Sequence, residues 1–441
     1  MLLYVREMET FIFPVPVIHS LTTLNFSMEL YYTFSILIVF SAIFAYLNLR
    51  FLKLPSTIGI MIIALVASLI LVTMGRTFPH LFDNATKFIA GVDLEEILMG
   101  AMLNFLLFAG AIHIRMDDLR EQRRYVIVFS TISVLISTVA VGGMLYFVLQ
   151  WLHMEIPLIQ CLVFGALISP TDPIAVLSIL KQAGVPKSLE TKIAGESLFN
   201  DGVAVVVFLT LLQLARESST EFSLSHVSVL LLKEALGGFA VGVLLGYTAS
   251  LAMKKIDNYK VEVLISLAVV TGGHLLAKAM HISGPLTMVA AGIVIGNYGK
   301  THAMSATTQD YLDKFWELID EIMNACLFLL IGLELLLIPD LGRYWLIGFL
   351  GIAIVLLARF LSIRIPSLII PFRERLDRRS VVILVWGGLR GGVSVALALS
   401  IDEHLNKPLL VAITYFVVVF SIIVQGLTIG KLTGAKGVRE C

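Results

Sequence analysis

The chain has 441 residues, of which 58% are hydrophobic and 15% charged, with no net formal charge and a mean hydropathy of +0.92. Ordinary soluble domains do not have this balance, so the composition indicates an integral membrane protein. The basic residues are scattered along the chain, which argues against a nucleic-acid-binding surface and a polybasic lipid-binding tail. We therefore expect small partners and a lipid bilayer around the protein.

Apolar runs of about 20 residues are the unit of a membrane-spanning helix, and the sequence predicts thirteen of them in an all-α polytopic membrane protein. They cover residues 28–49, 55–74, 95–113, 125–152, 157–180, 190–215, 227–253, 261–280, 282–298, 315–338, 344–369, 380–401 and 408–430.

The basic residues also predict how the chain is oriented. If the connections alternate between the two sides of the membrane, Lys and Arg divide between those sides by roughly three to one, which places the N-terminus outside and the C-terminus in the cytoplasm. Residues 1–27 are then an extracytoplasmic lead-in, 28–430 the transmembrane domain and 431–441 a short cytoplasmic tail.

Two segments at matching positions contain helix breakers. The fifth holds ISPTDPIAVL, from Ile168 to Leu177, and the twelfth holds WGGLRGGVSVALAL, from Trp386 to Leu399. An odd number of spans between two similar units inverts the second unit, so we predict inverted repeats formed by segments 1–6 and 8–13. Interrupted segments at matching positions of two halves indicate a transporter site at the repeat interface.

The first break places a carboxylate at membrane depth. Pro170 and Pro173 remove two backbone donors, so the helix is expected to open around Asp172. Unwound backbone persists in a membrane only where it is buried in protein or lines a wet cavity, and its carbonyls can bind a cation. Intramembrane carboxylates are usually functional. A simple proline kink, with Asp172 bonded to neighbouring backbone, is the structural alternative.

The sixth segment carries a narrow polar stripe. At helical spacing Glu196 stacks with Asn200 and Ser197 with Asp201, whereas the rest of the segment is apolar. Two carboxylates and a hydroxyl beside a broken helix suit a small hard cation, which prefers oxygen ligands. Because one carboxyl can hold either a proton or a metal ion, competition for it would give exchange.

Buried acids need compensation by buried cations. We predict that Arg390 forms a structural ion pair with Glu196, and that Arg359 is a second buried cation that could face the half-helix ends. Snorkelling to the interface is the alternative for both arginines. The pairing leaves Asp172 and Asp201 to bind the transported ions.

These motifs together resemble a known family. SPTDPIAVL, GESLFNDGVAVV, GPLTMVAAGIVIGN and WGGLRGGVSVALAL resemble, in that order, signatures of the sodium/proton exchangers of the first cation:proton antiporter family. The resemblance covers segments 5 through 12. It implies a homodimer in which a mobile core with two unwound, crossing helices works by elevator-like alternating access, without a cofactor.

The same resemblance implies roles for individual residues. The ion ligands would be Asp172, Asp201, Ser197 and the main-chain carbonyl of Thr171, and Asn200 would shape the site. The family's Asn-Asp pair, here Asn200 followed by Asp201, goes with electroneutral one-for-one exchange.

One position departs from the family pattern. Many such exchangers have an acidic residue after an LLF run in the third segment, where this chain has Ala109. An acid's contribution to the ion's outer shell is therefore missing, and the choice among Na⁺, Li⁺ and K⁺ stays open.

Four acids at the start of the tenth segment allow two interpretations. Asp313, Glu317, Asp320 and Glu321 are spaced three or four residues apart or adjacent, and could form a solvated face or an acidic mouth that concentrates cations. Charge runs are usually solvated faces, which favours the first interpretation.

The sequence thus predicts a plasma-membrane antiporter, not an enzyme, that exchanges cytoplasmic Na⁺ for external H⁺ and serves pH homeostasis. A K⁺/H⁺ antiporter of the same family is the nearest alternative. An intramembrane aspartyl hydrolase lacks its Gly-x-Gly-Asp signature here, and a cation channel would not need broken helices carrying a titrating aspartate on a moving core.

Overall fold

The computed structural model describes residues 34–75, 100, 102–173, 176–177, 180, 185, 187–216, 224–336, 341–370, 372 and 377–432. The predicted lead-in 1–27 and most of the predicted tail 431–441 lie outside these residues. Within them the chain is almost entirely helical, and an isolated antiparallel bridge joins Asp172 to Leu389.

The first half of the chain contains the following helices. They are Phe34–Leu52, α3 (Ser56–Gly75), α5 (Leu103–Ile112), α6 (Met116–Glu121), α7 (Arg123–Trp151), α8 (Leu158–Leu167), α10 (Lys187–Arg216) and α11 (Leu224–Met253).

The second half continues with α12 (Tyr259–Met280), α13 (Gly284–Val294), its extensions η3 (Ile295–Gly299) and α14 (Lys300–Ala303), and α15 (Ala306–Leu333). It ends with α16 (Trp345–Ile369), α17 (Arg378–Trp386), α18 (Gly392–Leu399), α19 (Lys407–Phe420), η7 (Ser421–Gln425) and α20 (Gly426–Leu432).

Eight helices of the described part are long and apolar enough to cross a membrane, which agrees with a multi-pass membrane protein. They correspond to eight of the thirteen predicted segments. The other five, 95–113, 157–180, 282–298, 315–338 and 380–401, coincide with short, interrupted or more polar helices, and three of them fall partly outside the described residues. The number of spans therefore stays a prediction.

Several helix starts follow from local sequence. The Asn258 side chain accepts hydrogen bonds from the first backbone N–H groups of α12, Ser283 does so for α13, and Ser305 for α15. These caps satisfy donors that have no partner inside the helix. Asp377 caps α17 in the same way, with 2.9 Å between its Oδ1 and the backbone N of Ser380.

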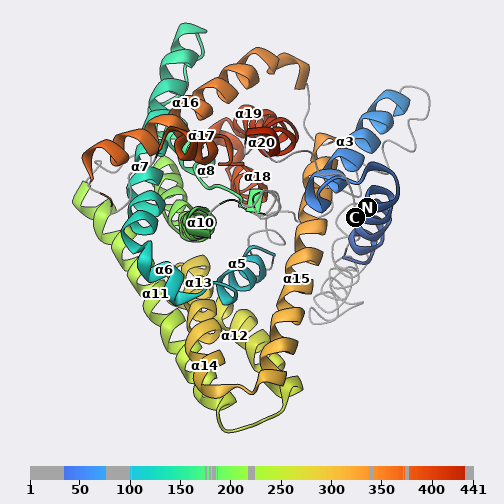
Figure 1. The fold of residues 1–441 in the computed structure, drawn as a ribbon. Coiled ribbons are helices and arrows are strands. Elements are labelled where there is room, and N and C mark those ends of the chain that lie inside the picture. Colours follow the sequence, from blue (N-terminus) through green and yellow to red (C-terminus); the bar gives the residue numbers. More distant parts are fainter. Residues whose placement is uncertain are drawn as a thin grey trace, which may run out of the picture.

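The helices that carry the polar stripe and the breaks lie at the centre of the molecule. Figure 1 shows α8, α10 and α18 there, with α7 and α16 on one side and α15 on the other. α15 separates α3 from the central helices and also contacts α5, α12 and α18. Its buried Trp316 lies against Phe108 of α5, 4.6 Å between ring centroids, and donates to Ser266 Oγ of α12 at 3.0 Å. These contacts fix the face that α15 presents to α18.

Arg216, at the end of α10, forms an ion pair with Asp402. The hydrogen bond from Arg216 is the largest cause of a lowered pKa at Asp402. A carboxylate with a lowered pKa stabilises the fold above its unfolded pKa, and this contribution disappears as the pH falls through the lowered value.

We therefore expect Arg216→Met to lower the melting midpoint slightly at neutral pH, because the pair is partly exposed. The difference from the wild type should shrink in acid. Melting curves of both proteins across acidic pH check this, and a difference that stays constant with pH would contradict it.

Candidate functional site

The two helix breaks meet each other. Helix α8 ends at Leu167, and the backbone N–H of Asp172 donates to the carbonyl oxygen of Leu389 at 2.8 Å. Leu389 lies in the gap between α17 and α18. Proline at 170 and 173 interrupts the first helix, and the glycine-rich run interrupts the second. Each break thus supplies the other with a backbone partner that it cannot find in its own helix.

Helix α10 holds the first break through side chains. Asn200 Nδ2 donates to Thr171 Oγ1 at 2.8 Å, Asn200 Oδ1 accepts from the Thr171 backbone N at 3.4 Å, and the Ser197 and Thr171 hydroxyl oxygens are 3.0 Å apart. All three residues are buried. The structure therefore brings Ser197, Asn200 and Thr171 together as a hydrogen-bonded cluster that fixes the path of the unwound chain.

Asp172 and Asp201 line one cavity of about 480 Å³. Asp201 is buried on α10, with 9% of its surface exposed, and Asp172 is partly buried. The Asp172 carboxylate lies against the main chain of Gly391, where a β-carbon would be 2.5 Å from Oδ2. The two carboxylates predicted to carry ions thus face the same space, Asp172 from the first break and Asp201 from α10.

The acids of α15 reach this cavity. Glu317, Asp320 and Glu321 line it together with the two aspartates, and Glu317 and Glu321 are exposed. Glu317 and Glu321 are thus exposed, as the solvated-face interpretation expects, and also line the cavity. The acidic mouth that concentrates cations stays a prediction. Asp313 is different, because it forms an ion pair with Lys300 and lies 3.6 Å from His113 Nε2.

The prediction that Glu196 pairs with Arg390 is wrong, because the partner of Glu196 is another arginine. Arg359 of α16 makes the pair, with 2.6 Å between its Nη1 and Glu196 Oε1, and both side chains are buried. Tyr125 OH of α7 also donates to Glu196 Oε2, at 3.4 Å. Arg359 Nη2 donates to the Leu384 carbonyl near the end of α17 at 3.2 Å, which partly fulfils the half-helix contact predicted for it.

Arg390 instead stabilises the end of the broken α8. Its Nη1 donates to the carbonyl oxygens of Ser169 and Pro170, at 2.9 Å each, and its backbone N–H donates to Ser421 Oγ at 2.9 Å. Carbonyls beyond the last turn of a helix have no helical partner, and a cation there is favourable. Sequence spacing could not assign the two arginines, because the assignment depends on how α16 and α17 pack.

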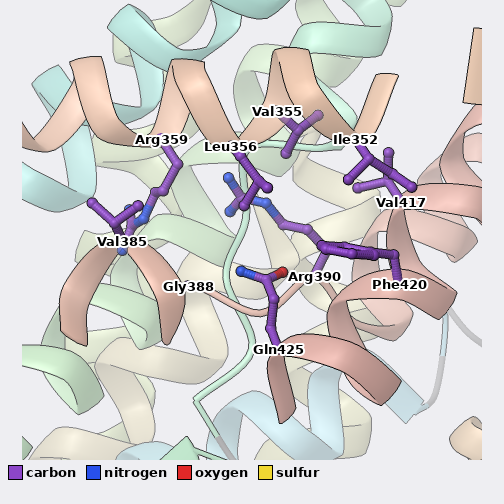
Figure 2. Close-up of a pocket in the computed structure, with 10 residues that line it drawn as sticks. All are labelled: Ile352, Val355, Leu356, Arg359, Val385, Gly388, Arg390, Val417, Phe420 and Gln425. Carbon is purple, nitrogen blue, oxygen red and sulfur yellow. The ribbon is translucent and has the colours of Figure 1, made fainter. Parts of the chain in front are cut away.

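The arginines also border a small second cavity of about 10 Å³ (Figure 2). Arg359 Nε, Arg390 Nε and Arg390 Nη2 have no hydrogen-bond partner within the described part of the chain. The cavity has room for about one water molecule, the usual partner of such buried donors.

Position 109 directly precedes Gly110, which lines the first cavity, and contributes no oxygen from its side chain. Ala109 is buried on α5, and its carbonyl contacts His113 Nδ1 at 2.7 Å. The α5 residues that line the cavity, Leu103, Leu106, Leu107 and Gly110, have no polar side-chain atoms. No α5 residue on the cavity wall therefore supplies a carboxylate in place of the acid that is absent at position 109.

Membrane helices arranged around two interrupted helices and two aspartates on one cavity define the class of multi-pass membrane transporters. The chain belongs to the sodium/hydrogen exchanger family, whose transmembrane family model matches residues 37–434.

Known proteins agree with this assignment. The chain is 47% identical over 401 residues to the Na⁺/H⁺ antiporter NhaP of Pseudomonas aeruginosa, a match that covers 90% of this chain and 94% of that protein. It is 33% identical over 392 residues to the Na⁺/H⁺ antiporter NhaH of Halobacillus dabanensis, covering 88% and 93%. The fold is similar to that of the sodium proton antiporter MjNhaP1 from Methanocaldococcus jannaschii, with a TM-score of 0.73, 20% identity and coverage of 92% and 98%.

Proposed function

We propose that this sodium/hydrogen exchanger carries Na⁺ and H⁺ alternately on Asp172 and Asp201. The observation that supports this most directly is that both carboxylates line one cavity where two helix breaks meet. A proton and a cation cannot occupy the same carboxylate oxygens together, so binding of one releases the other. Sodium arriving from the cytoplasm displaces a proton, and an external proton displaces sodium after the site has changed sides.

The remaining ligands in this proposal are Ser197 Oγ and the main-chain carbonyl of Thr171. The Thr171 carbonyl belongs to the unwound region, where oxygens are free of regular helical bonding, and Ser197 of α10 lies against it, with 3.0 Å between the two hydroxyl oxygens. Asn200 shapes the site by holding Thr171 with both its amide oxygen and its amide nitrogen. Because Asn200 adds no charge, one carboxylate fewer titrates than with aspartate there, which favours electroneutral one-for-one exchange.

The wider architecture of the proposal follows the sequence. We assign thirteen spans, with the interrupted fifth and twelfth segments crossing between inverted repeats, the N-terminus outside and the C-terminus in the cytoplasm of a plasma membrane. Glu317, Asp320 and Glu321 then lie at the cytoplasmic opening, where their charge concentrates cations. Alternating access proceeds by an elevator-like movement of the core within a homodimer.

Asp201→Asn tests the proposed site. In everted vesicles that carry an acid-loaded pH dye, we expect Na⁺ to cause dequenching with the wild type and only background dequenching with Asp201→Asn, because asparagine cannot exchange a proton. Asp310→Asn is the matched control, since Asp310 is also a helical aspartate, on α15, but pairs with Lys314 at the surface. The control variant should behave as the wild type.

Retained Na⁺-dependent exchange in folded Asp201→Asn would contradict the assignment of this carboxylate. Dequenching by K⁺ in preference to Na⁺ in the wild type would favour the K⁺/H⁺ alternative while keeping the site.

A further inference from the structure

Two buried oxygen atoms on the wall of the large cavity are left out of the site proposed above. Asn324 of α15 and Ser394 of α18 both line the cavity with Asp172 and Asp201. They are 1% and 0% exposed, and Asn324 Oδ1 and Ser394 Oγ have no hydrogen-bond partner within the described part of the chain. Buried polar atoms are nearly always hydrogen-bonded in native structures, so we expect each of these two oxygens to have a partner in the cavity.

The orientation of the Asn324 amide follows from its other contact. Its Nδ2 donates to the carbonyl oxygen of Asp320, one turn earlier in α15, at 2.8 Å. A carbonyl only accepts, so the nitrogen must face it and the amide oxygen must point away from it. Asn324 therefore offers an acceptor that the helix does not use.

The start of α18 is held between Asp172 and α15. A β-carbon at Gly391 would be 2.5 Å from Asp172 Oδ2, and one at Gly392 would be 2.3 Å from Leu327 Cδ1. Leu327 is three residues after Asn324 on α15, so the two share a face of that helix, and Ser394 is two residues after Gly392. Figure 1 shows α15 and α18 next to each other at the centre of the molecule. The unpartnered oxygens thus lie on α18, whose start lies against Asp172, and on α15, which packs against that start.

The α5 side of the cavity provides no side-chain oxygen for a cation. The residues of α5 that line the cavity are apolar, and Ala109 occupies the position where an acid is missing. A hard monovalent cation needs several oxygen ligands, and the two carboxylates with Ser197 Oγ and the Thr171 carbonyl leave part of its shell open. On the described cavity wall, the neutral side-chain oxygens come from α15 and α18.

We propose that Asn324 Oδ1 and Ser394 Oγ are cation ligands that complete the shell from the α15 and α18 side. The proposal rests on Asp172 and Asp201 being the ion carriers. Neutral oxygens bind the cation without binding an exchangeable proton, so they set affinity and ion preference and leave the coupling to the aspartates.

The test compares Asn324→Ala and Ser394→Ala with the wild type in everted vesicles. We expect each variant to raise the apparent KM for Na⁺ about tenfold, equivalent to about 1.4 kcal/mol, and to change the ratio of the KM values for Na⁺ and Li⁺. The maximal rate should stay within about twofold of the wild type, because the loss of one neutral ligand weakens the binding of Na⁺ more than it slows turnover. Asn324→Gln retains an amide oxygen and should recover part of the affinity.

The control is Ser133→Ala on α7. Ser133 is likewise a buried serine whose hydroxyl has no partner in the described part of the chain, but it does not line the cavity. Its KM values should match those of the wild type. Because Na⁺ bound to the folded protein raises its melting midpoint, the Na⁺-dependent shift in detergent gives a second measurement that does not depend on transport.

Unchanged KM values, an unchanged Na⁺ to Li⁺ ratio and an unchanged Na⁺-dependent melting shift in both alanine variants would overturn the proposal, and would mean that the two oxygens only bond water. If Asp201→Asn loses exchange in the same experiment, the failure concerns these ligands alone. If Asp201→Asn retains exchange, the site proposed above fails and this inference fails with it.

Discussion

Gly391→Ala is expected to reduce exchange on the order of a hundredfold, the cost of a displacement of about 1 Å in a preorganised site. A β-carbon at position 391 would lie 2.5, 2.8 and 3.0 Å from Oδ2, Cβ and Cγ of Asp172. Rotation of the carboxylate cannot relieve the contact with Cβ, so the unwound chain itself must move. The φ of Gly391 is −126°, which alanine tolerates, and the effect therefore comes from lack of space alone. Initial rates of Na⁺-dependent dequenching measure it.

Gly272→Ala and Gly143→Ala serve as controls for this prediction. Both glycines lie in membrane helices, and a β-carbon at either position meets nothing within 4 Å. Because alanine also has the higher helix propensity, these variants should fold and transport as the wild type does. Wild-type rates in Gly391→Ala would show that the contact with Asp172 is not needed for transport.

The second large effect is expected at the buried ion pair. Glu196→Gln and Arg359→Met should each lower the free energy of unfolding by about 3–5 kcal/mol, because each leaves one buried charge without its partner. The double variant removes both charges and should be more stable than the sum of the two single losses indicates. Unfolding of the four proteins in detergent gives the coupling energy of the pair.

Two further variants make this measurement specific. Combining Glu196→Gln with Arg390→Met tests the partner that the sequence suggested, and it should show weaker coupling, since Arg390 donates to the Ser169 and Pro170 carbonyls. Lys314→Met removes a cation from an exposed pair and should change stability by less than about 1 kcal/mol. Stronger coupling of Glu196 to Arg390 than to Arg359 would contradict the geometry.

The sequence by itself determined the class of the protein and the chemistry available to it. Long apolar runs allow only a membrane protein, since each run must bury its backbone polar groups within a helix. The prolines at 170 and 173 act on their own backbone, so the first break is a local property. The spacing of Ser197, Asn200 and Asp201 places them on one stripe of a helix whatever surrounds that helix.

Only the tertiary structure decided which of these groups meet. The choice between Arg359 and Arg390 as the partner of Glu196 depends on how α16 and α17 pack, and two arginines in apolar segments look alike in sequence. The acids of α15 and the oxygens of Asn324 and Ser394 are far from Asp172 along the chain, and they reach its cavity because Gly391 and Gly392 let α18 approach Asp172 and α15 closely. Helix periodicity describes one element at a time, whereas a cavity is shared by several, so its composition follows from packing.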